Sequence, residues 1–236
     1  MIKQLFGKIT DNEKREATEF IFTQSYPDPS FFLMIILSVA MASLGLLINS
    51  SIVIIGSMMI APILYPILGL SMGIVMLDYK LIRHSLITTI KVMLICILSA
   101  SLISHLLLQQ VEYNEEILSR TNHSVTHALI GVVAGLAAAF AIVKPKLSET
   151  LPGVALSVSL LPPLAVTGIA LSRFDFEAML GAFLLFVVNI IGVVSATSFI
   201  FYLMNFYSER ALAETTINIE EKIEELDEKI SNDKKD

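Results

Sequence analysis

The sequence predicts an all-α integral membrane protein with six transmembrane helices, arranged as a 3+3 inverted repeat in which helices 2 and 5 are broken by proline. Three observations predict this class. The 236 residues are 55% hydrophobic, with a mean hydropathy of +0.74, a composition typical of membrane proteins. The apolar residues form runs of about twenty, the length of helix that crosses the hydrocarbon core. Two of these runs contain prolines in the same arrangement, about 97 residues apart.

Six apolar segments divide the chain into three regions. Residues 1–30 are expected to form a cytoplasmic lead-in, and residues 31–204 the membrane domain. Residues 205–236 are expected to form an acidic cytoplasmic tail. The polar turn at residues 49–51 predicts that the first two segments form an antiparallel hairpin. The predicted spans are Phe31–Ile48, Ile52–Leu77, Leu86–Leu108, Val125–Val143, Leu151–Leu171 and Met179–Met204.

The two interrupted runs are the basis for the repeat. One reads GSMMIAPILYPILGLSMG from Gly56 to Gly73, and the other reads PGVALSVSLLPPLAVTGIA from Pro152 to Ala170. Repeat 1 then covers about 31–108 and repeat 2 about 125–204, with three helices each, so the second copy is inverted. Interrupted helices at matching places in two halves mark a site near mid-membrane in many transporters. Aligning the runs pairs Gly56 with Gly153, Pro66 with Pro163 and Asp78 with Asp175.

Basic residues predict the orientation. With six spans, both tails share a side, and that side carries most of the lysines and arginines, whereas the other side has only Arg120 and Arg173 in its loops. The positive-inside rule therefore predicts that both termini are cytoplasmic.

Candidate transport or binding residues gather at the interrupted helices. A proline removes a backbone donor and disrupts the bond to the carbonyl one turn earlier, which protein or water must then satisfy. Freed carbonyls coordinate cations, and the N-termini of half-helices attract anions. The alternative interpretation is that the prolines only bend helices for packing. The candidates are Pro62, Pro66, Ser71, Lys91, Ser157, Ser159, Pro162, Pro163, Thr167 and Asn189.

Two of these candidates have a second interpretation. Lys91 places an ammonium inside a predicted span, which usually marks function, but it lies close enough to Leu86 for its side chain to reach the cytoplasmic interface. Asn189 near the middle of the last span is either a ligand or a hydrogen-bonding partner of another helix. Asp78 and Asp175 are expected at opposite sides of the membrane, where each would cap the helix that follows it.

Enzymatic chemistry is not predicted. No G-x-S-x-G, H-E-x-x-H or P-loop motif occurs, so no catalytic residue, metal site or cofactor is expected. The single cysteine, Cys96, cannot form a disulfide within the chain. The formal net charge of −6 argues against a nucleic-acid partner.

The tails and small residues predict a homo-oligomer in the lipid bilayer. The pairs Gly69/Gly73 and Gly131/Gly135 favour close helix contacts, which would suit contacts between subunits. The C-terminal tail has a short heptad pattern, which would form a coiled coil or pack on its own subunit. Apolar residues near the N-terminus predict either an amphipathic helix on the inner leaflet or an ordered lead-in. The heptad residues are Leu212, Ile219, Ile223, Leu226 and Ile230.

The proline-containing motifs resemble those of a known family. The runs Gly45–Leu70 and Leu151–Ile169, together with LFVVN at Leu185–Asn189, are similar to the prokaryotic "uncharacterised hydrophobic domain" family, the domain of unknown function numbered 389. The resemblance covers roughly residues 30–205. It implies an integral protein of the plasma membrane of a prokaryote, bacterium or archaeon, with no established activity. Some relatives carry a larger soluble region before the membrane part.

Two functional hypotheses follow. The first is a transporter or channel for a small solute or ion, with its site at the interrupted helices. The second is a membrane scaffold or sensor that does not transport and acts through its cytoplasmic C-terminal helix.

Overall fold

The computed structural model describes residues 10–107, 112–121, 125–144 and 160–209. All regular structure in these ranges is helical. The elements are α2 (Asp11–Ser25), α3 (Pro29–Leu47), α4 (Ser51–Ile60), α5 (Leu64–Met76), α6 (Tyr79–Leu107), α7 (Glu115–Leu118), α8 (Val125–Val143), α10 (Leu161–Ser172), α11 (Phe176–Leu203) and the 3-10 helix η2 (Phe206–Glu209).

Membrane-length helices dominate the described ranges. Four helices are long and apolar enough to cross a bilayer, and α4 together with α5 makes a fifth if this bent pair is one span. The apolar helix α10 has 12 residues, and the segment before it, 145–159, lies outside the described residues. The all-helical prediction is therefore confirmed, with four to five candidate spans in the part described. The four are Pro29–Leu47, Tyr79–Leu106, Thr126–Val143 and Phe176–Leu203.

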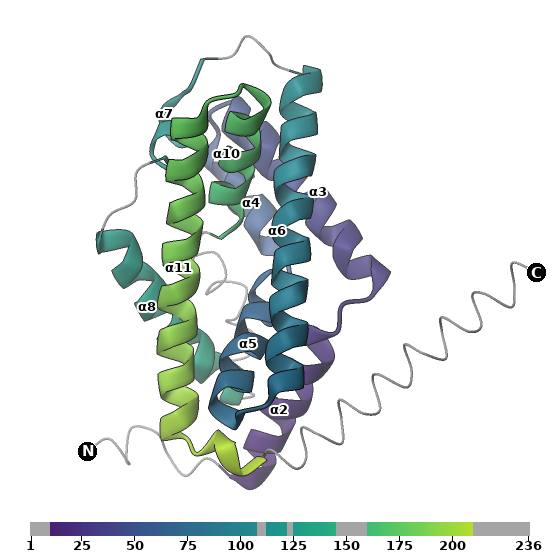
Figure 1. Cartoon of the computed structure of the whole chain (residues 1–236), viewed down its shortest axis with the longest axis vertical. Coiled ribbons are helices and arrows are strands. Elements are labelled where there is room, and N and C mark those ends of the chain that lie inside the picture. Colours follow the sequence, from purple (N-terminus) through teal and green to yellow (C-terminus); the bar gives the residue numbers. More distant parts are fainter. Residues whose placement is uncertain (1–9, 108–111, 122–124, 145–159, 210–236) are drawn as a thin grey trace, which may run out of the picture.

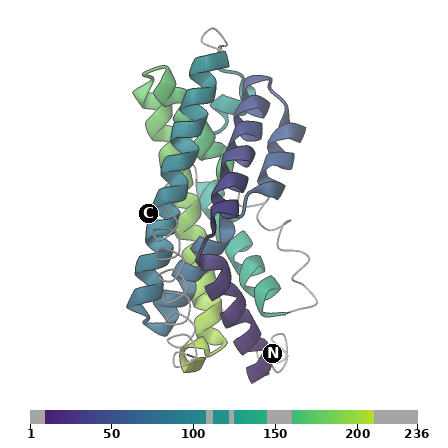
Figure 2. The same ribbon diagram turned by 90° about the vertical axis from the view of Figure 1, so that its right-hand side faces the viewer.

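The bundle is elongated, and two long helices, α6 and α11, run along it (Figure 1). Between them α5 occupies the lower half and α10 the upper half, and each of these short helices packs on both long ones. Helix α8 packs along α11, while α3 packs on α4, α6 and α10. Figure 2 shows α3 and α4 side by side at one edge of the bundle. The short helices therefore form the centre of the molecule.

Aspartates set the starts of both long helices. The Asp78 carboxylate accepts a hydrogen bond from the Leu81 amide at 3.1 Å, and the Asp175 carboxylate accepts one from Ala178 at 3.0 Å. Side-chain oxygens at this position satisfy amides that the helix leaves unbonded. The predicted caps are thus confirmed, and α6 and α11 begin earlier than the expected starts at residues 86 and 179.

The turns before these caps have the same geometry. Leu77 and Phe174 both adopt the left-handed conformation, with φ of 54° and 56°, which is uncommon for residues other than glycine. The Asp78 amide donates to Gly73 O at 3.0 Å, and the Asp175 amide donates to Ala170 O at 3.1 Å. Each short helix therefore ends with the same left-handed closure before the next begins.

The predicted hairpin of the first two apolar segments is also present. Helix α3 ends at Leu47 and α4 starts at Ser51, with Asn49 at φ 56° between them. A Cβ atom added to Gly45 would lie 3.0 Å from the Ile54 amide nitrogen. This glycine is what permits the two helices to pack so closely at the turn.

The contacts of the glycine pair in α8 correct one expectation. A Cβ atom at Gly131 would lie 3.0 Å from Asn189 O, and one at Gly135 would lie 2.7 Å from Val193 O. Both carbonyls belong to α11 of the same chain, so this glycine face is used within the subunit. It is not free for contacts between subunits, because α11 already occupies it.

Helix α2 has its apolar face against the protein. Ile21 and Phe22 are fully buried, and the helix packs mainly on α5. At its start, Glu13 completes a capping box with Thr10 and forms an ion pair with Lys144 at 3.2 Å. In the described residues, the apolar face of α2 is therefore covered largely by α5. The C-terminal heptad residues, Leu212, Ile219, Ile223, Leu226 and Ile230, lie outside the described residues.

Candidate functional site

The candidate site is the centre of the bundle, where α5 and α10 begin. Helices α4 and α5 are bent by 54° relative to each other across a three-residue break that contains Pro62. Helix α10 begins at Leu161, and Ser157 and Ser159 just before it lie outside the described residues. From the middle of the molecule, α5 runs toward one end and α10 toward the other (Figure 1).

The prolines lie at helix starts. Pro66 is the third residue of α5, while Pro162 and Pro163 are the second and third residues of α10. Proline is tolerated in the first turn because its missing N–H would have no partner there. The sequence analysis expected these prolines to free backbone carbonyls in the middle of a helix. The structure instead places all three in the first turn of a helix. They fix where each half-helix begins and leave fewer unbonded amides in its first turn.

Neither half-helix has a side-chain cap. The N-cap positions are the apolar residues Ile63 and Leu160, and neither provides a cap hydrogen bond. The first turns keep the amides of Leu64, Tyr65 and Leu161 as donors without a partner within the helix. The N-terminus of a helix carries a partial positive charge of about half an elementary charge. Two such ends therefore lie near the centre of the bundle, and neither N-cap residue, Ile63 or Leu160, has a carboxylate or hydroxyl to offer.

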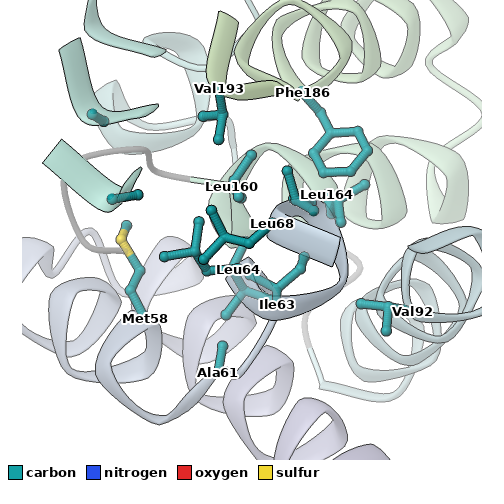
Figure 3. Packing of buried hydrophobic residues seen from close by; sticks show 14 of the residues in the cluster. Met58, Ala61, Ile63, Leu64, Leu68, Val92, Leu160, Leu164, Phe186 and Val193 are labelled. Atoms are coloured by element: carbon teal, nitrogen blue, oxygen red, sulfur yellow. The ribbon is translucent and has the colours of Figure 1, made fainter. Parts of the chain in front are cut away.

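The space between the two starts is filled with apolar side chains. Ile63, Leu64 and Leu68 lie beside Leu160 and Leu164 (Figure 3), and all five are at most 5% exposed. Phe186 and Val193 of α11 close the same region. We call these seven residues the apolar plug. Among the described residues, the side chains that fill the junction are thus buried and apolar.

The predicted hydroxyl ligands bond within their own helices. The Ser71 hydroxyl donates to Ile67 O at 3.0 Å, and the Thr167 hydroxyl donates to Pro163 O at 2.8 Å. Both side chains are buried. Such bonds to the carbonyl four residues earlier satisfy a hydroxyl in an apolar setting. A ligand at the junction would have to compete with them.

Asn189 and Lys91 lie in different settings. Asn189 is 4% exposed and shares a face of α11 with Phe186 and Val193, so it lies beside the apolar plug. Lys91 is exposed on α6 next to exposed residues such as Ile90 and Leu94. The structure therefore brings Asn189 to the junction and leaves Lys91 on the outer surface of the bundle.

A polar cluster at the end of α10 was not anticipated from the sequence. The Arg173 guanidinium lies over the Tyr113 ring, 4.9 Å from its centroid. Burial, together with the nearby Asp175 carboxylate, raises the pKa of Tyr113 to about 12. Next to it, the Ser172 hydroxyl donates to the Ser104 hydroxyl at 2.9 Å. No local motif signals this cluster, because it depends on the packing of α10 against α6.

A second unanticipated cluster joins α7 to the α3–α4 hairpin. The Asn114 side-chain amide donates to Leu46 O at 2.6 Å, near the end of α3. The Ser51 hydroxyl donates to the Glu116 carboxylate, which also pairs with Arg120 at 2.5 Å. The bond from Ser51, followed by the charge of Arg120, lowers the pKa of Glu116. These contacts hold α7 against the turn that starts α4.

Comparison with known proteins gives a family without an activity. Residues 58–195 match a family described as "Domain of unknown function (DUF389)". The chain is 34% identical over 161 residues to "Uncharacterized protein MJ0678" of Methanocaldococcus jannaschii, a match that covers 68% of this chain and 50% of that protein. The chain thus spans about half the length of this curated relative. No solved structure matches it.

Proposed function

Since the chain belongs to the DUF389 family, for which no activity is described, we propose from its geometry that it is a transporter or channel for a small solute or ion. The pathway would pass through the junction of α5 and α10. The single observation that carries this proposal is the meeting of two uncapped half-helix N-termini in the middle of a membrane-type bundle.

The same proposal includes the 3+3 inverted repeat. Its support is the spacing of 97 residues that relates Leu77 to Phe174 and Asp78 to Asp175, with equal backbone conformations and equal cap bonds. Helices α3 and α8 both have 19 residues. Helices α5 and α10 run in opposite directions, as do α6 and α11 (Figure 1). Inverted repeats of this kind put the substrate site where the two halves meet.

The electrostatic field at the N-termini of α5 and α10 favours an anion or the anionic end of a polar solute. Helix N-termini bind anions because their unbonded amides and the helix dipole both favour negative charge. Leu64, Tyr65 and Leu161 supply these amides. The Asn189 side chain, on the face of α11 that borders the junction, would add a polar group. Lys91 lies too far out on α6 to serve as a direct ligand in this conformation.

The apolar plug would act as a gate. Hydrophobic constrictions in channels gate by excluding water, and here apolar side chains also fill the space. Leu64 and Leu164, from the two half-helices, belong to the plug. Opening would require the half-helices to separate, which would expose the amides of their first turns to solute.

The test is flux in liposomes that contain the purified chain. We expect uptake of small anions above protein-free liposomes, and a further increase for Leu64→Ser and Leu164→Ser, because a hydroxyl lets water enter the plug. Leu94→Ser is the matched control, since Leu94 is 50% exposed on the outer face of α6. If the folded wild type and both plug variants carry no solute across a panel of anions, cations and neutral metabolites, the transport proposal fails.

The apolar side chains at the junction favour one alternative, a scaffold or sensor that does not transport and acts through the C-terminal tail. An anchoring bundle needs a packed centre, and the described residues there are packed. Deletion of residues 208–236 separates the two functions. A transporter keeps its flux after this deletion, whereas a scaffold loses its cellular role although its membrane part still folds.

A further inference from the structure

A groove of about 830 Å³ lies between α6 and α10, at the end of the bundle where both helices finish. One part of its lining is apolar and includes Leu98 and Leu102, which are 63% and 59% exposed. Polar residues form the remainder. The lining residues are Leu98, Ser101, Leu102, Ser104, His105, Leu171, Ser172, Arg173 and Phe174.

The groove lies at the end of a candidate membrane span. The span in α6 ends at Leu106, directly after His105, and Arg173 is the C-cap residue of α10. Phe174 and Phe176 are 79% and 63% exposed at the same end. Exposed aromatic residues at the end of a span are typical of the boundary between hydrocarbon and lipid headgroups.

We propose that this groove binds one phospholipid with an anionic headgroup. Its phosphate would lie beside Arg173 and His105, and one acyl chain would follow Leu98 and Leu102. Arginine suits this role because its planar guanidinium binds phosphate oxygens through two parallel hydrogen bonds. The charge of the lining and the apolar face of α6 thus match the two ends of the same ligand.

The residues around Arg173 fix the position of the guanidinium. Tyr113 contacts it face-on at 4.9 Å, and the pKa of this tyrosine lies far above neutrality, so its ring is uncharged. Asp175 is close by, and one of its oxygens accepts the Ala178 amide as a helix cap. This carboxylate offsets part of the positive charge of the guanidinium. Arg173 is the arginine of the described lining, so the preference for an anionic headgroup is expected to depend on this residue.

The opposite end of the molecule provides an internal comparison. A groove of about 530 Å³ lies there between α5 and α11, and its described lining has no basic residue. The spacing of 97 residues pairs Leu77 with Phe174, and His105 with Tyr202. The same spacing pairs Arg173 with Met76, which has no charge. This second groove is expected to take lipid without preference for charge. Its lining residues are Val75, Leu77, Tyr202, Leu203, Asn205 and Tyr207.

Native mass spectrometry of the full chain in detergent tests the proposal, with dioleoylphosphatidylglycerol and dioleoylphosphatidylcholine added in equal amounts. We expect the wild type to retain one phosphatidylglycerol in preference. Arg173→Gln should lower that retention about tenfold, because one charge-assisted hydrogen bond is worth about that factor. Arg173→Lys should keep most of the preference. Arg120→Gln is the control, since Arg120 lies at the same end, pairs with Glu116 and does not line the groove.

A second variant covers the possibility that Arg173→Gln does not fold. Leu102→Trp fills the apolar part of the groove and should remove the bound lipid of either kind. Retention of phosphatidylglycerol at the wild-type level in folded Arg173→Gln or in Leu102→Trp overturns the proposal. Equal binding of the two lipids by the wild type also overturns the proposal. A dimer whose interface covers Ser101 in the groove and excludes lipid overturns it as well. Inorganic phosphate that displaces no lipid supports the lipid as the ligand, and displacement by millimolar phosphate would assign the site to the free ion.

Discussion

Asp78 and Asp175, 97 residues apart, make the same hydrogen bond at opposite ends of the bundle. Each side-chain oxygen accepts the amide of the residue three positions later, at 3.1 and 3.0 Å. Each follows a residue with a left-handed backbone, Leu77 in one case and Phe174 in the other. The same local hydrogen bonding therefore starts α6 and α11, although the two turns lie at opposite ends of the bundle.

Removal of either cap should destabilise the protein by a similar amount. We expect Asp78→Ala and Asp175→Ala each to lower the free energy of unfolding by about 1 kcal/mol, the usual effect of losing an N-cap. Asp→Asn at the same positions should cost less, because the amide oxygen still accepts the bond. Thermal unfolding in detergent measures this. A full loss with asparagine would mean that the charge, and not the cap, is what stabilises the turn.

Glycines at tight and open helix contacts should respond in opposite ways. In Gly135→Ala the new methyl group would lie 2.7 Å from Val193 O, so α8 and α11 must separate and the melting temperature should fall. In Gly56→Ala the nearest atom is Met41 Cε at 3.6 Å, an ordinary contact. That variant should be neutral or more stable by up to about 1 kcal/mol, since alanine favours helix over glycine. Equal effects in both variants would show that contact distance does not decide the outcome.

Local sequence signals predicted the features that depend on neighbouring residues. The helix caps at residues 78 and 175 and the turn at 49–51 follow from short-range hydrogen bonds, so the pattern was sufficient. The prolines were informative for the same reason, but their effect was misassigned. A proline marks a discontinuity, and only the fold shows that Pro66 and Pro163 lie just after it, within the first turn of a new helix.

Features that depend on tertiary packing were beyond the sequence. The pair Gly131/Gly135 indicated a close helix contact, but not that the partner is α11 of the same chain. The hydropathy of α6 could not show which face is buried. The sequence therefore left Lys91 open between a site inside the membrane and a side chain that reaches the interface, and the structure places it on the exposed face. The cluster of Tyr113 and Arg173 joins a loop to the end of α10, and no sequence spacing relates the two.

The orientation in the membrane can be tested with single cysteines, because the native Cys96 is fully buried. Glu115 and Lys80 are exposed at the two ends of the bundle. If both termini are cytoplasmic, a membrane-impermeant maleimide should label Glu115→Cys in intact cells and Lys80→Cys only after lysis. The wild type is the control and should not react. The reverse labelling pattern would invert the proposed topology.

The Glu116 cluster should make stability depend on pH. The Ser51 hydroxyl, followed by Arg120, lowers the pKa of Glu116 from its ordinary value of 4.5. A carboxylate whose pKa is lower in the folded state stabilises the fold above the unfolded value, and this stabilisation is lost as the pH falls through the folded pKa. The melting temperature of the wild type should therefore decrease as the pH drops below about 4.5.

The variant Glu116→Gln isolates this contribution. It should be less stable than the wild type at pH 7, where the carboxylate is charged, and the difference should shrink below about pH 4.5 as the wild-type carboxylate takes up its proton. Glu115→Gln is the matched control, since Glu115 is the exposed neighbour in the same short helix. If the difference between wild type and Glu116→Gln stays constant across this range, the ionised carboxylate does not hold α7 on the α3–α4 hairpin, and shape alone accounts for the contact.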